Sequence, residues 1–131
     1  MSNTLAFSNQ KGGVGKTTSA VNVALSLAVT EVKTLLIDLD PQANATTGLS
    51  DLVIEPNGTI YDVILGNDNV KNCIAKTSFS FLDIIGSTSD LVGAEVELVS
   101  VMAREYQLKK ALEKIERQYD CLLYTSPSPR D

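Results

Sequence analysis

One stretch near the N-terminus decides the fold, and it reads Lys11-Gly12-Gly13-Val14-Gly15-Lys16-Thr17-Thr18. It follows a short apolar run at residues 4–7 and combines glycines, two lysines and two hydroxyls. Because glycine has no Cβ, successive backbone N–H groups can converge on a polyphosphate, and the following helix adds the positive end of its dipole. We therefore interpret residues 11–18 as a phosphate-binding loop. The alternative is a flexible turn, which would not require a strand before it and a Lys-Thr-Thr helix start after it.

The side chains of this loop have separate expected tasks. Lys16 supplies a point charge to the β and γ phosphates of a nucleotide, and the hydroxyl of Thr17 faces Mg²⁺. The loop departs from the standard pattern G-x-x-x-x-G-K-[ST], because Gln10 stands where that pattern has its first glycine. A second lysine, Lys11, stands at a position where the standard pattern requires none.

This departure resembles the deviant Walker A ATPases. The stretch Asp38-Leu39-Asp40-Pro41-Gln42-Ala43-Asn44-Ala45-Thr46 is similar to the switch I segment of ParA and Soj type partition ATPases, which act on chromosomes or plasmids. A third stretch, Gly93-Ala94-Glu95-Val96-Glu97-Leu98, resembles the same branch, and the likeness extends from Asn3 to Asp120. The resemblance implies an ATPase that binds ATP and Mg²⁺ and forms a homodimer around the nucleotide. It also implies nonspecific DNA binding through the C-terminal half of the family's domain, and stimulation of hydrolysis by a ParB-type partner.

The resemblance also implies roles for individual residues. Lys11 would reach across the dimer to the partner's phosphates, in the manner of an arginine finger. Asp40 would position or activate the attacking water, and Asp38 would belong to the switch and metal region. Simpler interpretations stay open, since Lys11 could be an exposed loop lysine and the aspartates could serve turn chemistry before Pro41.

Hydrophobic periodicity predicts an α/β domain with a mostly parallel, Rossmann-like sheet flanked by helices. Residues 4–8 form the first expected strand, and helical spacing follows at Ala20, Val23, Ala24, Leu27 and Ala28. The apolar run at residues 34–37 suits a buried parallel strand. Further along, we expect a short helix at residues 60–65, a strand at 81–85, and a helix through Leu108, Ala111, Leu112 and Ile115.

Composition narrows the chemistry. With 11 Lys and Arg against 16 Asp and Glu, the net charge of −5 gives the chain as a whole no electrostatic attraction for DNA. There is no histidine, so catalysis must use carboxylates, lysines and a metal. Cys73 and Cys121 lack the C-x-x-C spacing of a metal or redox site, and we expect two reduced thiols. No apolar run approaches the length of a membrane span, so we expect a soluble, unexported protein with no membrane partner. The reduced thiols fit the cytoplasm, and the family resemblance implies an association with the nucleoid.

The C-terminal residues do not fit the family pattern. We expect residues 1–120 to be the N-terminal part of a ParA-like domain, truncated after roughly its first half, and residues 121–131 to be an anomalous tail of foreign or out-of-frame sequence. The family's Walker B aspartate would fall at Thr125, and the Ser and Pro residues after it should not continue a central strand. The printed chain is therefore expected to be inactive as an ATPase.

Two other functions remain as alternatives. A sibling ATPase such as MinD or the nitrogenase iron protein shares the loop, but these would require an amphipathic C-terminal helix or paired cluster cysteines. A fragment that binds nucleotide or a partner without catalysis is the alternative from a different class, because Thr125 is not a carboxylate.

Overall fold

The computed structural model describes residues 3–9, 14–40, 43–54, 58–66, 69–87 and 100–127. Five strands form one sheet in the order β1-β5-β2-β4-β3. Their bounds are β1 Asn3–Asn9, β2 Thr34–Asp38, β3 Ala75–Lys76, β4 Leu82–Ile85 and β5 Cys121–Pro127. All neighbouring pairs are parallel except β3 and β4, which are antiparallel. This mostly parallel sheet confirms the predicted fold class.

The middle strands are buried because their sequences are almost continuously apolar. Every residue of β2 and of β4 is buried. A strand covered by helices on both faces needs apolar side chains in both directions, so its sequence does not alternate. The strands expected at residues 34–37 and 81–85 are therefore confirmed to within one residue at each end.

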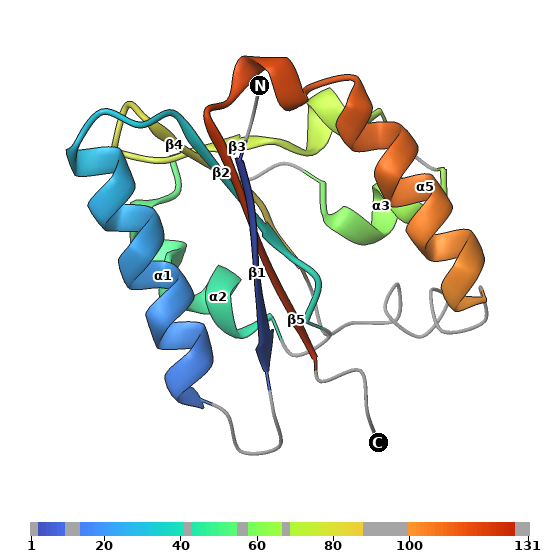
Figure 1. Cartoon of the computed structure of the whole chain (residues 1–131), viewed down its shortest axis with the longest axis horizontal. Coiled ribbons are helices and arrows are strands. Elements are labelled where there is room, and N and C mark those ends of the chain that lie inside the picture. The colour runs from blue at the N-terminus through green and yellow to red at the C-terminus, as the bar shows by residue number, and fades with distance from the viewer. Residues whose placement is uncertain are drawn as a thin grey trace.

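Helices α1 (Val14–Val29) and α2 (Asn44–Gly48) lie on one side of the sheet (Figure 1). The spacing of small residues along α1 predicted the face that packs on the strands. Ala20 and Ala24 are fully buried, and Ala28 is nearly so. Ala24 and Ala28 join a core cluster that includes Leu36 of β2 and Leu49, the residue that follows α2.

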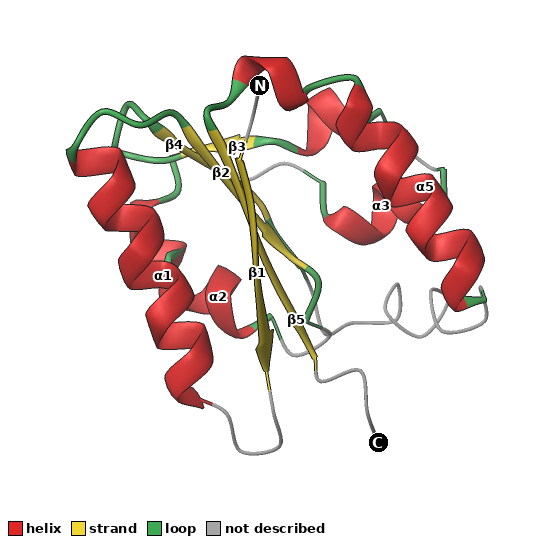
Figure 2. Ribbon diagram, viewed as in Figure 1, coloured by secondary structure: helices red, strands yellow, loops and turns green. Residues whose placement is uncertain are grey.

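Helices α3 (Ile60–Ile64) and α5 (Val101–Glu113) lie on the opposite side, so the sheet separates two helical layers (Figure 2). Thr59 begins α3 with a capping box, in which its side chain accepts from the N–H of Tyr61 while the Asp62 carboxylate accepts from the N–H of Thr59. Ser100 caps α5 by accepting from the N–H of Ala103. A second core cluster forms between these helices and the sheet.

Short turns connect these elements. The 3₁₀ turns are η1 (Ser50–Leu52), η2 (Val70–Cys73) and η3 (Glu116–Gln118). The helix expected through Ile115 ends as α-helix at Glu113, and Ile115 is fully buried in the turn that follows. Gly66 ends α3 with a φ of 77°, a left-handed conformation that suits glycine.

The expectation that the Ser and Pro residues after Thr125 should not continue a central strand is wrong for Ser126 and Pro127, because the strand that begins at Cys121 extends to Pro127. Residues 121–127 form β5, which pairs in parallel with β1 on one side and with β2 on the other. Cys121, Leu122 and Leu123 are buried, and this apolar start is enough to insert the strand. Pro127 stands at the last position of β5, where a missing N–H interrupts no further ladder.

Candidate site at the carboxyl edge of the sheet

The carboxyl ends of β1, β5 and β2 lie in register at one edge of the sheet. Asn9 pairs with Pro127, and Asp38 pairs with Thr125. In open α/β sheets this edge is where ligands bind. The strand ending at Asn9 and the helix beginning at Val14 create the strand, loop and helix order that a phosphate loop requires. Residues 10–13, with Lys11, Gly12 and Gly13, lie outside the described residues.

The rest of the predicted loop opens helix α1. Val14, Gly15, Lys16, Thr17 and Thr18 are its first five residues, so the helix begins one residue before the expected Gly15 and two before Lys16. The first turn of α1 has no acidic residue. A helix N-terminus without a carboxylate keeps its free N–H groups and its positive dipole end available to an anion. The individual roles of Lys11, Lys16 and Thr17 stay predictions.

Asp38 ends β2 and is completely buried. Its Oδ1 accepts from the N–H of Asp40 at 2.9 Å and from the hydroxyl of Thr125 at 3.0 Å. Its Oδ2 accepts from the N–H of Thr46 at 2.9 Å and from the Thr46 hydroxyl at 2.6 Å. Asp38 therefore fixes the residues that follow it in the chain to the end of its own strand.

Burial raises the pKa of the Asp38 carboxyl, because a charged carboxylate loses its hydration inside the protein. The hydrogen bonds from Thr46, Asp40 and Thr125 lower the pKa and offset this effect in part. A folded-state pKa above the unfolded value means that ionisation of Asp38 opposes folding as the pH rises through that interval. A cation near Asp38 would favour its charged form.

Asp40 is also buried, with 5% of its surface exposed. Its N–H donates to Asp38, and its carbonyl accepts from the hydroxyl of Ser87 at 2.7 Å and from the N–H of Ala43 at 2.8 Å. The structure therefore brings the two predicted aspartates together at one edge. Pro41 and Gln42, which follow in the switch-like stretch, and the family-like stretch at residues 93–98 lie outside the described residues.

Sequence reasoning missed the contributions of Thr46 and Ser87. Thr46 belongs to the switch-like stretch at residues 38–46, but no spacing rule predicts that its hydroxyl donates a hydrogen bond to Asp38. Ser87 follows β4 and is 47 residues from its acceptor at Asp40. A weak signal existed, because Gly86-Ser87 follows a predicted strand, and polar residues at the carboxyl ends of parallel strands gather at one edge.

The donor types at this edge fit Mg²⁺ and a nucleotide. Hydroxyl and carboxylate oxygens are the ligands that Mg²⁺ prefers, and Asp38 places such a carboxylate at the edge of the sheet where β1 also ends, with β5 between the two strands. Within the described part of the chain, no three His, Cys, Asp or Glu side chains cluster as a metal site. The two oxygens of Asp38 already accept four hydrogen bonds, so these residues fit an ion that keeps part of its water shell.

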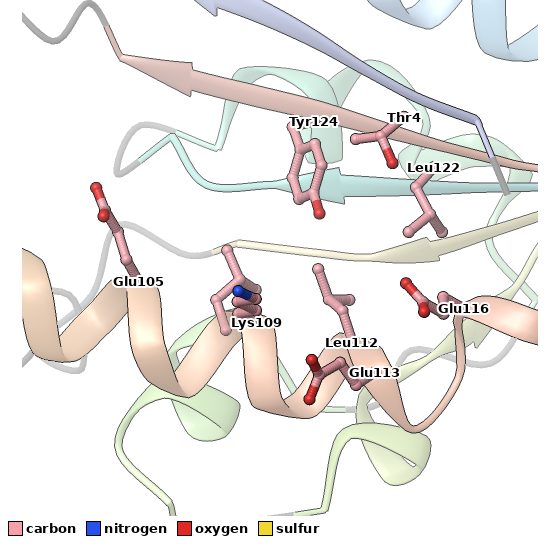
Figure 3. Close-up of a pocket in the computed structure, with 9 residues that line it drawn as sticks. Thr4, Glu105, Lys109, Leu112, Glu113, Glu116, Leu122 and Tyr124 are labelled. Carbon is pink, nitrogen blue, oxygen red and sulfur yellow. The ribbon is translucent and has the colours of Figure 1, made fainter.

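A separate cavity of about 480 Å³ lies between α5 and the strands β1 and β5 (Figure 3). Leu112 of α5 and Leu122 and Tyr124 of β5 contribute to its wall. Its charged lining consists of Glu105, Lys109, Glu113 and Glu116. Three carboxylates against one lysine would repel a polyphosphate, so this cavity is not the nucleotide site. Burial, and the nearby charge of Glu116, raise the pKa of the Tyr124 hydroxyl.

The strand, loop and helix order, the parallel sheet and the buried aspartates at its carboxyl edge together define a P-loop NTPase domain of the α/β class. The sequence matches a family model described as an AAA domain over residues 2–130. The chain belongs to this family, in the branch of the ParA and Soj partition ATPases.

Two curated relatives indicate this branch. The chain is 44% identical over 123 residues to the chromosome partitioning protein ParA of Myxococcus xanthus, covering 94% of this chain and 44% of the relative. It is 42% identical over 127 residues to the sporulation initiation inhibitor protein Soj of Bacillus subtilis, covering 97% of this chain and 50% of the relative. The chain thus spans about half the length of the curated relatives it matches.

Solved structures share the fold. A complex of a McdA variant from Cyanothece with ATP superposes with a TM-score of 0.82 at 28% identity, covering 98% of this chain and 49% of the other. Cobyrinic acid a,c-diamide synthase from Mycobacterium smegmatis, with an ATP analogue and magnesium, gives 0.80 at 32% identity, covering 97% and 50%.

Proposed function

We propose that the full-length protein is an Mg²⁺-dependent ATPase that acts in chromosome or plasmid segregation. The observation that carries this proposal is that β1 ends and α1 begins at the same edge of the sheet as the buried Asp38 and Asp40 (Figure 1). Lys11 lies in the sequence between β1 and α1, and Lys16 lies in α1. Relatives named as partition proteins, and solved structures with ATP or an ATP analogue and magnesium, support it.

In this proposal the chain's residues act mainly by positioning and charge neutralisation. The backbone of residues 11–18 and Lys16 hold the phosphates, while Thr17 and the Asp38 region hold Mg²⁺. Bound Mg²⁺ would neutralise charge on the transferred phosphoryl group. Asp40 orients the attacking water, since the chain has no histidine to do so. Lys11 neutralises phosphate charge on the opposite protomer of a nucleotide-dependent homodimer.

The two lysines provide the sharpest test of this arrangement. In the full-length protein, Lys16→Ala should abolish ATP binding in calorimetry, whereas Lys11→Ala should bind ATP as a monomer and lose the ATP-dependent dimer in size-exclusion chromatography. Lys71→Ala, at an exposed lysine of η2, serves as the matched control and should leave both properties unchanged. ATP-dependent dimers of Lys11→Ala would contradict the role of Lys11 across the dimer.

Asp40 is tested by the rate of hydrolysis. Asp40→Ala should retain ATP binding and accumulate an ATP-bound dimer, because the water would lose its orienting carboxylate. Asp51→Ala, at an exposed aspartate of η1, is the control. Unchanged phosphate release by Asp40→Ala, with and without DNA and a ParB-type partner, would assign Asp40 to turn chemistry alone.

DNA and the activating protein complete the proposed cycle. The net charge of −5 means that nonspecific DNA binding must come from a local basic surface, which we place in the C-terminal half of the family's domain.

Within the described residues, no helix is both long and apolar enough to cross a bilayer. We propose a cytoplasmic location on the nucleoid, tested by imaging a fluorescent fusion together with a DNA stain. A diffuse or membrane-bound signal would contradict it.

One observation favours a second candidate for the polypeptide as printed, namely a chain that binds nucleotide without hydrolysing it. Position 125, where the resemblance places the Walker B aspartate, carries a threonine whose hydroxyl donates to Asp38. We propose that residues 121–131 depart from the native family sequence. Sequencing the genomic DNA beyond codon 120 tests this, and an uninterrupted reading frame with Thr125 in place would overturn it.

A further inference from the structure

Two hydroxyl side chains tie the segment after β2 to the end of β4. The Thr46 hydroxyl donates to Asp38 Oδ2 at 2.6 Å and accepts from the N–H of Ser87 at 2.9 Å. The Ser87 hydroxyl, in a residue only 6% exposed, donates to the carbonyl of Asp40 at 2.7 Å. The two bonds that involve Ser87 connect residues 41 and 47 positions apart, so they are a product of the tertiary fold.

The network holds the backbone of Asp40 on both sides. Its N–H donates to Asp38, and its carbonyl accepts from Ser87 and from the N–H of Ala43. Since Thr46 also binds Asp38 through its own N–H, the acceptor of the Asp40 N–H is fixed in turn. Movement of Asp40 would therefore require several buried hydrogen bonds to break together, which is costly inside a protein.

The same hydrogen bonds hold a strained backbone conformation at Ala43. Ala43, which precedes α2, has a φ of 56° and a ψ of 38°, in the left-handed region that alanine disfavours because its Cβ crowds the backbone. Such a conformation persists only when the surroundings determine it. The hydrogen bonds from Thr46 and Ser87 anchor the chain on either side of Ala43.

Gly86 provides the space for the contact. A Cβ at position 86 would lie 3.1 Å from Thr46 Cγ2 and 3.4 Å from Thr46 Oγ1. A side chain there would push Thr46 away from Asp38 and Ser87. The Gly86 carbonyl also accepts from the N–H of Ile60 at 2.8 Å, which secures this end of β4 against α3.

We infer that Thr46 and Ser87 are positioning residues for ATP hydrolysis, which set the place of Asp40 without touching the nucleotide. This inference rests on the proposed ATPase function and on the assignment of Asp40 to the attacking water. Thr46 acts through Asp38, and Ser87 acts through the backbone of Asp40. Because neither hydroxyl is assigned to phosphate binding, their loss should slow the chemical step and spare nucleotide affinity.

The test uses the full-length protein and the variants Thr46→Val and Ser87→Ala. Valine keeps the shape of threonine and removes the hydroxyl, so it breaks both side-chain bonds of Thr46. We expect kcat for ATP hydrolysis to fall about 10-fold to 100-fold, the scale that misplacement by about 1 Å produces. The Kd for ATP should stay within about twofold, and Thr46→Ser should restore most of kcat because it retains the hydroxyl.

Thr47→Val is the matched control, because Thr47 is the next residue on α2 and is exposed. It should keep wild-type kcat and Kd. Thermal unfolding identifies variants that do not fold, and Ser87→Ala carries the test if Thr46→Val fails to fold. A wild-type kcat in folded Thr46→Val or Ser87→Ala would overturn the inference, as would a parallel loss of ATP affinity. A wild-type protein that neither binds nor hydrolyses ATP would instead overturn the proposed function.

Discussion

Tyr119→Phe should destabilise the protein, because it removes a hydroxyl that donates a buried hydrogen bond to a carboxylate. The Tyr119 hydroxyl donates to Asp83 Oδ2 at 2.7 Å. Tyr119 is 5% exposed and Asp83 is 1% exposed, so water cannot replace the lost donor. Lys76 and Lys33 also lie near Asp83 Oδ2, with their Nζ atoms at 3.3 Å and 3.5 Å.

The magnitude follows from these contacts. A hydrogen bond to a charged group contributes about 1.5–3 kcal/mol, and loss of one partner leaves the other undersatisfied. The two lysines still face Asp83 in the variant and limit the damage. We therefore expect the free energy of unfolding to fall by about 2 kcal/mol.

Urea unfolding of the full-length protein, followed by circular dichroism, measures this change as a lower midpoint with an unchanged slope. Tyr106→Phe is the matched control, because Tyr106 on α5 is 62% exposed, and its unfolding free energy should change by less than about 0.5 kcal/mol. If Tyr119→Phe also changes by less than about 0.5 kcal/mol, the reasoning about the buried bond is refuted.

The same bond predicts a pH dependence. Burial, and then the hydrogen bond to Asp83, raise the pKa of Tyr119 above its ordinary value of 10.0. The stabilisation is fully present below the unfolded pKa and is lost as the pH rises above it, because only the unfolded chain then releases the proton. The difference in stability between wild type and Tyr119→Phe should therefore narrow above pH 10.0.

The local geometry at a helix cap, at two glycines and at the two cysteines leads to three more predictions. Thr59→Ala should lower the unfolding free energy by about 1 kcal/mol by removing the cap of α3, while Thr59→Ser should retain most of it, and equal effects in urea unfolding would contradict the cap. Gly66→Ala should cost about 1 kcal/mol because of its φ of 77°, whereas Gly48→Ala inside α2 should be neutral or stabilising, as thermal unfolding will measure. Cys73 and Cys121 are buried and form no disulfide, and burial raises the pKa of the Cys121 thiol, so both should react with a thiol reagent only after unfolding. Rapid modification of the native protein would contradict this burial.

Much of the fold could be predicted because it depends on local patterns. The run at residues 34–37 is apolar enough to indicate a buried parallel strand, and the alanines of α1 repeat with helical spacing. The prediction that the Ser and Pro residues after Thr125 would not continue a strand was wrong for Ser126 and Pro127, because the apolar residues 121–124 insert the strand. A single proline at a strand end is tolerated, which composition does not convey.

The sequence by itself determined the class of site in this protein. A glycine-rich loop between a strand and a helix, two lysines and an aspartate pair after the next strand have few other uses, because the carboxyl ends of parallel strands meet at one edge of the sheet. Only the tertiary structure decided which distant residues support that edge. Ser87 meets Asp40, Thr125 meets Asp38, and Tyr119 meets Asp83 because parallel strands place residues far apart in sequence side by side. Hydrogen bonds of this kind depend on strand order and register, which no local pattern of residues records.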